Sequence, residues 1–300
     1  MTTGVLLMAH GTPASTSEIA PFYTRIRRGR SPTPEQLAEL EARYTAIGGV
    51  SPLTLRTTAQ VDAVRAELEE RAPGRYTVAF GAKHTDPLIE ESAARLGAAG
   101  LDRVIGLVLT PHSSSLGSQE YLDRAEDALG RTPFVPVAAW YADPSLVTLL
   151  AARVQDALRA VTGRTKVIFT AHSLPERIRE TGDTYPEQLA ESARIVATAA
   201  GLDEWLVAWQ SAGRTPEPWL GPDVRDVVRQ LASDRLADAV VVCPVGFVSD
   251  HLEVLFDLDV EVASIAEASG LGYARTASLN DDPAFIATLA DLIIATDGAP

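Results

Sequence analysis

Unbroken apolar runs recur along the whole chain, separated by segments whose apolar residues follow a helical period. Seven such runs are VLLMA (5–9), YTVAFGA (76–82), VIGLVLT (104–110), FVPVAAW (134–140), KVIFTA (166–171), WLVAW (205–209) and AVVVC (239–243). Strands of a parallel sheet are buried on both faces, so they read as continuous apolar runs rather than alternating ones. Segments of helical period, such as 57–72, 189–201 and 224–237, lie between them. This alternation predicts parallel sheets flanked by helices on both faces.

The two halves of the sequence echo one another. Residues 8–13 read MAHGTP and residues 170–175 read TAHSLP, so each half carries an Ala-His pair at a strand end. A second pair of segments, 107–127 and 240–259, gives a strand, a proline, a polar turn and an acid-bearing helix in both halves. We therefore predict two similar Rossmann-like α/β lobes, 1–143 and 144–300, with a last helix that packs back on the first lobe. The active-site cleft is expected between them, because ligands bind at the carboxyl ends of parallel strands.

Composition narrows the class of protein. The 300 residues are 46% hydrophobic, enough for the cores of two domains. No apolar run approaches the ~18 residues that span a bilayer, and no basic residues precede the first run, so it is expected to be a strand rather than a signal peptide. The net charge of −14 argues against a nucleic-acid partner.

A single cysteine, Cys243, limits the redox and metal chemistry. One cysteine forms no intramolecular disulfide, and it cannot supply the thiolates of an iron–sulfur cluster. We therefore expect a cytosolic protein with no cluster and no resident cofactor.

The segment CPVGFVSDHLEVLFDLDVE (243–261) places Glu253, Asp257 and Glu261 at intervals of four, with His251 just before them. One interpretation is a solvated acidic helix face. However, apolar residues fill the gaps, and half-buried carboxylates cost free energy unless cations or hydrogen bonds compensate. Oxygen ligands with one imidazole favour a loosely held divalent ion such as Fe²⁺ or Mg²⁺. The row is therefore interpreted as a path for a metal ion.

His172 ends the strand 166–171 and precedes a Ser-Leu-Pro turn. Imidazole binds metals and accepts protons near neutral pH; the alternative is a histidine satisfied by backbone groups at a strand end. The internal echo places His172 and Glu253 at ends of the same sheet, which predicts that the acidic row delivers a metal ion to these two residues. It also makes His10 the counterpart of His172 in the first lobe.

Potential anion-binding groups gather in the first lobe. TRIRRGR (24–30) contains four arginines, which bind a small anionic ligand or simply form a solvated helix end. Arg43, Tyr44 and Ser51 lie near a Gly-Gly turn. Together with Arg27 and Tyr121, these side chains are candidates for hydrogen bonds to carboxylates, which arginine binds through its planar fork.

Several segments closely resemble ferrochelatases, the enzymes that insert Fe²⁺ into a porphyrin in haem synthesis. The segments are AHSLPERI, WQSAGRTPEPWLGPD, CPVGFVSDHLEVLFDLDVE, YTRIRRGRSPTPEQLAEL, RYTAIGGVSPL and GAKHTDPLIEESA, and they extend over nearly the whole chain. The chain is most similar to the coproporphyrin III ferrochelatases of Gram-positive bacteria, which implies a chelatase-type fold and the conversion of coproporphyrin III to coprohaem. Alternatives are a protoporphyrin IX ferrochelatase, an enzyme inserting cobalt or nickel into a tetrapyrrole, and a non-catalytic tetrapyrrole carrier.

The resemblance also implies roles for individual residues. His172 and Glu253 would flank the porphyrin nitrogens and contact the iron, and Asp257 and Glu261 would continue the metal path. Propionate contacts are implied for Arg27, Arg43, Tyr44, Ser51 and Tyr121, and an outer metal contact for His84. His10 stands where many relatives carry a tyrosine that ligates product iron. The expected partners are coproporphyrin III and Fe²⁺, with transient contacts to other haem-pathway enzymes, no stable membrane insertion and a monomeric state.

Overall fold

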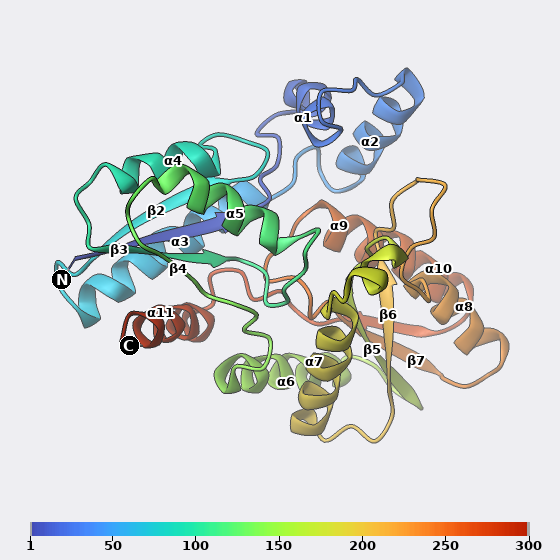
Figure 1. The fold of residues 1–300 in the computed structure, drawn as a ribbon. Helices are drawn as coiled ribbons and strands as arrows, with labels where there is room; N and C mark the ends of the chain where they lie inside the picture. The colour runs from blue at the N-terminus through green and yellow to red at the C-terminus, as the bar shows by residue number, and fades with distance from the viewer. Residues whose placement is uncertain (1, 299–300) are drawn as a thin grey trace.

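The computed structural model describes residues 2–298, which form two four-stranded parallel sheets (Figure 1). The first sheet has the order β2-β1-β3-β4, and the second has the order β6-β5-β7-β8. The strands are β1 (Thr3–Ala9), β2 (Tyr76–Ala82), β3 (Arg103–Val108), β4 (Phe134–Pro136), β5 (Thr165–His172), β6 (Trp205–Gln210), β7 (Ala239–Cys243) and β8 (Gly272–Arg275). The predicted fold of two parallel-sheet lobes is confirmed.

The strand order of one sheet repeats in the other with an offset of four strands, so β1 corresponds to β5 and β3 to β7. Two edge strands depart from the sequence pattern. β4 pairs only over Phe134–Pro136, since a proline has no N–H to donate to a ladder. β8, Gly272–Arg275, lacks an apolar run and was not predicted, but it pairs with β7.

Helices cover both faces of each sheet. Around the first sheet lie α3 (Leu53–Arg71), α4 (Ile89–Gly97) and α5 (Ser118–Leu129). Around the second lie α7 (Tyr185–Ala200), α8 (Val224–Ser233) and α10 (Ala263–Ala268). Two short 3₁₀ turns, Thr16–Glu18 and Glu176–Thr181, complete the connections.

The lobes exchange helices. Helix α6 (Pro144–Leu158) follows β4 of the first sheet but packs on α7 and β7 of the second. Helix α11 (Pro283–Gly298) follows β8 but packs on α3 and β3. The buried Asp297 carboxylate of α11 accepts hydrogen bonds from the Thr3 hydroxyl at 2.8 Å and from Arg75 Nε at 2.8 Å.

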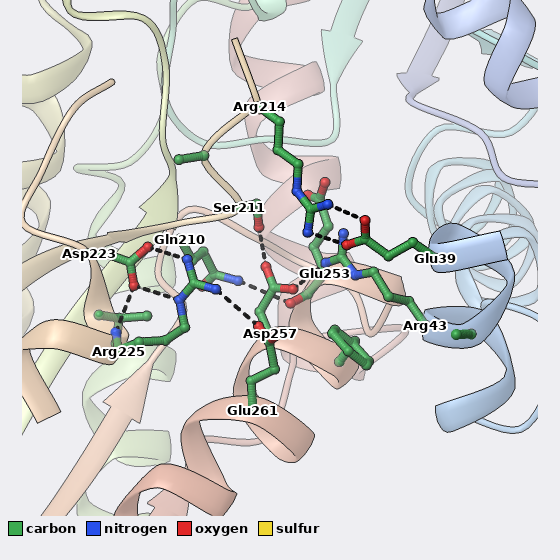
Figure 2. Close-up of a pocket in the computed structure, with 14 residues that line it drawn as sticks. Glu39, Arg43, Gln210, Ser211, Arg214, Asp223, Arg225, Glu253, Asp257 and Glu261 are labelled. Carbon is green, nitrogen blue, oxygen red and sulfur yellow. Dashed lines mark hydrogen bonds and ion pairs between the residues drawn. The ribbon is translucent and has the colours of Figure 1, made fainter. Parts of the chain in front are cut away.

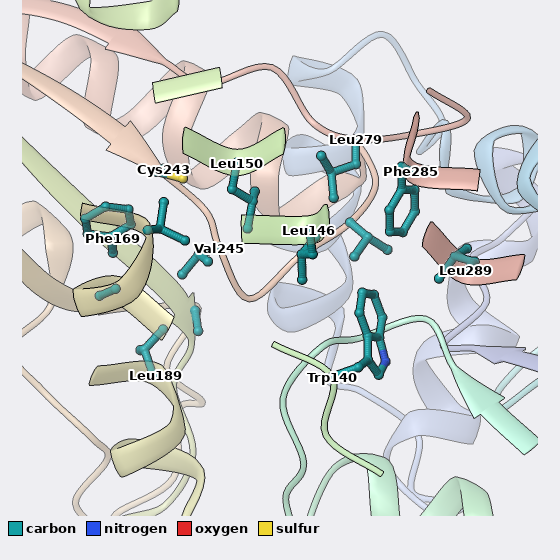
Figure 3. Close-up of a cluster of buried hydrophobic side chains, with 14 of the residues drawn as sticks. Trp140, Leu146, Leu150, Phe169, Leu189, Cys243, Val245, Leu279, Phe285 and Leu289 are labelled. Atoms are coloured by element: carbon teal, nitrogen blue, oxygen red, sulfur yellow. The ribbon is translucent and has the colours of Figure 1, made fainter. Parts of the chain in front are cut away.

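One apolar cluster runs through both lobes (Figure 3). It includes Trp140, whose ring stacks on Phe285 of α11 with centroids 6.1 Å apart, and it continues to Phe169 and Cys243 of the second sheet. The shared core and the exchanged helices hold the strand ends of the two sheets in a fixed relation.

Helices α1 (Ile19–Ile26) and α2 (Pro34–Ala46) project from the first lobe toward the second (Figure 1). A small apolar cluster of Ile19, Tyr44 and Leu252 joins α2 to the second lobe. Helix α2 begins with a capping box, in which Thr33 and Gln36 bond each other's backbone N–H. Within residues 2–298, none of the helices combines the length and apolar character required to span a membrane.

Candidate active site

His172 and Glu253 meet where β5 and β7 end. The two strands are neighbours in the sheet, so the residues that follow them lie close together. His172 Nε2 is 3.5 Å from Glu253 Oε1, and His251 Nε2 is 3.7 Å from Glu253 Oε2. About a third of the His172 and Glu253 side chains is exposed, at 34% and 32%. The pair is therefore accessible to a ligand.

Backbone contacts orient the His172 ring. Its Nδ1 bonds the Ser173 carbonyl, and the hydroxyl of Tyr185 donates to the His172 carbonyl at 3.0 Å. Because Nδ1 of His172 donates to the Ser173 carbonyl, Nε2 of the same ring is directed at Glu253. Both interpretations offered by the sequence thus hold in part, because one ring nitrogen is satisfied by the backbone and the other faces the carboxylate.

The charges of the pair reinforce one another. Desolvation acts to lower the pKa of His172, but the Glu253 carboxylate outweighs it and raises that pKa to about 9. Desolvation acts to raise the pKa of Glu253, but His172 and His251 bring it well below its usual range. At neutral pH the pair is an imidazolium and a carboxylate, so His172 accepts another proton only after releasing the one it carries.

The turn before Glu253 depends on a close backbone approach. A Cβ on Gly246 would lie 2.5 Å from Ala171 Cβ and 2.9 Å from Ala171 Cα, so only glycine fits against the end of β5. Gln210, at the end of β6, donates to the Glu253 carbonyl at 3.1 Å and accepts from the Thr170 hydroxyl at 2.9 Å. Sequence reasoning missed Gln210, although its place at the end of the strand 205–209 was a usable signal.

The acidic row lies on an unusual helix. Helix α9 (Leu252–Val254) runs into a π-helix, η3 (Leu255–Val262), which continues as α10. A regular helical face was expected, whereas the i→i+5 bonding of a π-helix widens the turn and is frequent at functional sites. Asp257 is buried, and Asp257, Glu261 and Glu253 line one cavity of about 330 Å³ between α2 and the second lobe (Figure 2).

Arginines accompany two of the row's carboxylates. Arg43 of α2 pairs with Asp257 Oδ1, while the Ser211 hydroxyl donates to Asp257 Oδ2. Arg225 of α8 lies 3.5 Å from Glu261. Burial raises the pKa of Asp257, and Arg43 opposes that shift. The compensating cations for these acids are thus protein side chains, and Arg225 and Ser211 were not among the predicted site residues.

Across residues 2–298, no three His, Cys, Asp or Glu side chains converge to hold a metal ion. The row therefore presents its carboxylates one after another, rather than as a single coordination sphere.

Three predicted first-lobe residues lie within electrostatic reach of Glu253. Desolvation lowers the pKa of His10, and the Glu253 carboxylate opposes that shift. Desolvation raises the pKa of Tyr44 and that of Tyr121, and the Glu253 carboxylate adds to both shifts. The His10 side chain is exposed at the end of β1, with its ring centroid 4.7 Å from that of His84. The structure thus brings His10, Tyr44 and Tyr121 toward the His172–Glu253 pair from the opposite lobe.

The other predicted anion-binding residues make local contacts. The Tyr44 hydroxyl is 3.2 Å from the Thr12 hydroxyl, and the buried Ser51 hydroxyl accepts from the Leu53 N–H at 3.3 Å. The Arg27 guanidinium lies 5.6 Å from the centre of the Tyr23 ring. None of these contacts links Arg27 or Ser51 to the His172–Glu253 pair.

The ferrochelatase family model matches residues 2–297. The chain belongs to the ferrochelatase family. The resemblance seen in its motifs is thereby confirmed. The coproporphyrin III ferrochelatase of Bacillus subtilis is 42% identical over 299 residues, which cover 97% of this chain and 96% of that one. A second, from Anoxybacillus flavithermus, is 40% identical over 97% of this chain and 95% of its own.

Other similar proteins widen the comparison. A ferrochelatase of Herpetosiphon aurantiacus is 41% identical over 97% of this chain and 98% of its own. The solved structure of the sirohydrochlorin chelatase SirB from Bacillus subtilis subspecies spizizenii, in complex with cobalt, aligns with a TM-score of 0.55 at 12% identity, covering 99% of this chain and 95% of that one. The structure of CbiX, described as the terminal enzyme of sirohaem biosynthesis in denitrifying bacteria, aligns with a TM-score of 0.54 at 17% identity. The alignment covers 97% of this chain and 98% of that one. At these identities the likeness is one of fold, and it confirms the predicted chelatase-type architecture.

Proposed function

We propose that this ferrochelatase-family protein inserts Fe²⁺ into coproporphyrin III to form coprohaem. The observation that carries the proposal is the His172–Glu253 pair, 3.5 Å apart and faced by His10 from the opposite lobe. The pair combines a carboxylate suited to binding a metal ion with an imidazole that can take up a proton after releasing the one it carries. Relatives about 40% identical over nearly the whole chain and named coproporphyrin III ferrochelatase support the choice of substrate.

Metal insertion requires pyrrole protons to leave as the metal enters. In our proposal the macrocycle binds between the lobes and is bent, so that its nitrogens tilt toward His172 and Glu253. Binding energy from the remote propionates offsets a strain of roughly 1–5 kcal/mol. Fe²⁺ loses its waters stepwise along Glu261, Asp257 and Glu253. Two pyrrole protons leave as Fe²⁺ enters: His172, having released its own proton to solvent water, accepts one, and solvent water takes the other. His10 contacts the iron of the product from the other face, with His84 beside it.

Carboxylate recognition is assigned to the first lobe. Arg27, Arg43, Tyr44, Ser51 and Tyr121 are proposed to contact the propionates. A tetracarboxylate approaching a chain of charge −14 needs a local positive entrance, which the arginines at 25–30 supply. Coproporphyrin III uses such an entrance more fully than protoporphyrin IX, which carries fewer propionates.

The proposal extends to the setting of the reaction. We place it in the cytosol and assign no resident cofactor, because the one cysteine, Cys243, is buried and cannot ligate a cluster alone. We also propose that the protein acts as a monomer and passes coprohaem on through transient contacts with other haem-pathway enzymes.

The test is anaerobic incubation of the protein with Fe²⁺ and either coproporphyrin III or protoporphyrin IX, following loss of free-base absorbance. Faster insertion into coproporphyrin III supports the proposal, whereas equal or faster insertion into protoporphyrin IX contradicts the substrate assignment. Parallel runs with Co²⁺ and Ni²⁺ test the other chelatase activities. Tight porphyrin binding without insertion of any metal would indicate a carrier.

A further inference from the structure

Asp257 stands in the middle of the acidic row with both oxygens engaged. Arg43 reaches it from α2 of the first lobe, and Ser211 reaches it from the loop after β6. Asp257 is 5% exposed and so depends on these partners rather than on water. A divalent cation moving from Glu261 to Glu253 therefore meets the positive charge of Arg43 at this point.

Arg43 is bound to Asp257 through only one of its guanidinium nitrogens. Its Nη2 bonds a single Asp257 oxygen, its Nε is buried without a hydrogen-bond partner, and its guanidinium lies 4.8 Å from the centre of the Phe256 ring. Arg225 is held differently, because its Nε and Nη2 grip both oxygens of Asp223 at 2.9 and 2.7 Å. An arginine fork is most stable in such a two-point contact with a carboxylate. Of these two arginines lining the cavity, Arg43 can therefore leave its carboxylate partner more easily than Arg225 can.

Helix α2 has a separate tie to the second lobe. Glu39, one turn before Arg43 on the same helix face, pairs through both oxygens with Arg214 (Figure 2). Arg214 and Glu39 line the same cavity as Arg43 and Asp257. The Arg43 side chain can consequently change partners while α2 stays in place.

We propose that Arg43 gates the acidic row, leaving Asp257 for a carboxylate of the bound porphyrin and so admitting Fe²⁺ only after the macrocycle is seated. The inference rests on the proposed function, since Arg43 is among the residues assigned to the propionates. It adds an order of binding, macrocycle before metal, and an exchange of one ion pair for another. No covalent bond changes, and the guanidinium keeps its charge throughout.

The first test measures Co²⁺ affinity by calorimetric titration without porphyrin. Arg43→Gln should bind Co²⁺ about tenfold more tightly than the unaltered protein, because a positive charge beside Asp257 is removed. Adding Asp257→Asn to that variant should cancel the gain. Equal affinity in Arg43→Gln and the unaltered protein, or a gain that survives Asp257→Asn, overturns the gate.

Arg214→Gln is the charge-matched control. It removes an arginine from the other ion pair of α2 in the same cavity, and it should bind Co²⁺ like the unaltered protein. A gain equal to that of Arg43→Gln would mean that overall charge or a loosened α2 produces the effect, and the gate would be overturned.

The second test repeats the titration with copper(II) coproporphyrin III, which presents the same carboxylates but has a filled centre. The unaltered protein should bind Co²⁺ about tenfold more tightly with this porphyrin than without it, and Arg43→Gln should show no such change. A porphyrin that leaves the Co²⁺ affinity of the unaltered protein unchanged contradicts the gate. Iron insertion by the unaltered protein is scored separately, so failure of the gate is distinguishable from failure of the proposed function.

Discussion

The two lobes have the same strand order, yet their strand ends carry different chemistry. His10 follows β1 as His172 follows β5, and Lys83 follows β2 at the position that Gln210 holds in β6. Counting from the prolines at 111 and 244, Glu120 corresponds to Glu253. Each lobe thus has a histidine and a glutamate at equivalent places.

The residue at the end of the neighbouring strand, Lys83 in the first lobe and Gln210 in the second, determines which partner the glutamate carboxylate has. In the first lobe, Lys83 Nζ lies 2.9 Å from Glu120 and neutralises it. In the second lobe, Gln210 is uncharged and bonds the backbone carbonyl of Glu253, which leaves the carboxylate to His172. In the second lobe, where the neighbouring strand end lacks a competing cation, the glutamate is left to pair with the histidine.

The largest effect on iron insertion is expected when Glu253 is replaced, whereas replacing its counterpart Glu120 should have little effect. Glu253→Gln removes the carboxylate that raises the pKa of His172 and that we propose as the metal ligand, so iron insertion should fall about a hundredfold or more. Glu120→Gln breaks only a partly exposed ion pair, and the rate should stay within about twofold. Steady-state insertion rates of the two variants check this, and equal losses would contradict the distinction between the lobes.

A smaller effect is expected at the turn before Glu253. Gly246→Ser installs the residue that the first lobe has at the equivalent position, Ser113. The new Cβ collides with Ala171 and displaces the turn, so insertion should fall about tenfold while porphyrin binding persists. Insertion kinetics and porphyrin fluorescence quenching measure the two properties separately. An unchanged rate would show that the close approach does not position Glu253.

Helix α11, which follows the second sheet but packs on the first lobe, carries the buried carboxylate of Asp297 into that lobe. Thr3, Arg75 and Tyr76 hold Asp297, and although burial acts to raise its pKa, these partners bring it below the usual value. Asp297→Asn should lower the free energy of unfolding by about 2 kcal/mol, as measured by urea denaturation. A variant as stable as the unaltered protein would show that the network does not hold α11.

The pH dependence follows from the same depressed pKa. The contribution of Asp297 is complete above its unfolded-state pKa of about 4. It is lost as pH falls through the lower folded-state value. The stability difference between the unaltered protein and Asp297→Asn should therefore shrink as the pH is lowered below about 4.

The smallest expected effect is a change in the pKa of His10 when Lys83, the cation beside Glu120, is replaced. Lys83 is one of the charges that lower the pKa of His10, after desolvation. Lys83→Gln should raise the pKa of His10 as followed by NMR titration, without reproducing the value near 9 of His172. A pKa that stays the same or falls would remove Lys83 from the comparison.

Much of this frame was predictable from local pattern. Continuous apolar runs located seven of the eight strands found within residues 2–298, and the Ala-His echo placed His10 and His172 at equivalent ends. The association of His172 with Glu253 followed from parallel strands that meet at one sheet edge.

What the sequence could not reveal depends on contacts between distant segments. Arg43 and Asp257 are 214 positions apart, and nothing local indicates that they pair. The acids of the π-helix have the four-residue spacing expected of a regular helical face, so that spacing gives no sign of the wider turn. β8 has too few apolar residues to signal a strand and forms because β7 offers a free edge.

The most direct test of the account is single-turnover iron insertion by His172→Ala and His10→Ala, with coproporphyrin III binding measured separately. We predict that His172→Ala binds the porphyrin but loses insertion by about a hundredfold or more. We predict that His10→Ala still inserts iron and gives a product with an altered absorption spectrum. Insertion at the unaltered rate by His172→Ala, or an equal loss in both variants, would contradict the claim that the second lobe alone carries the catalytic pair.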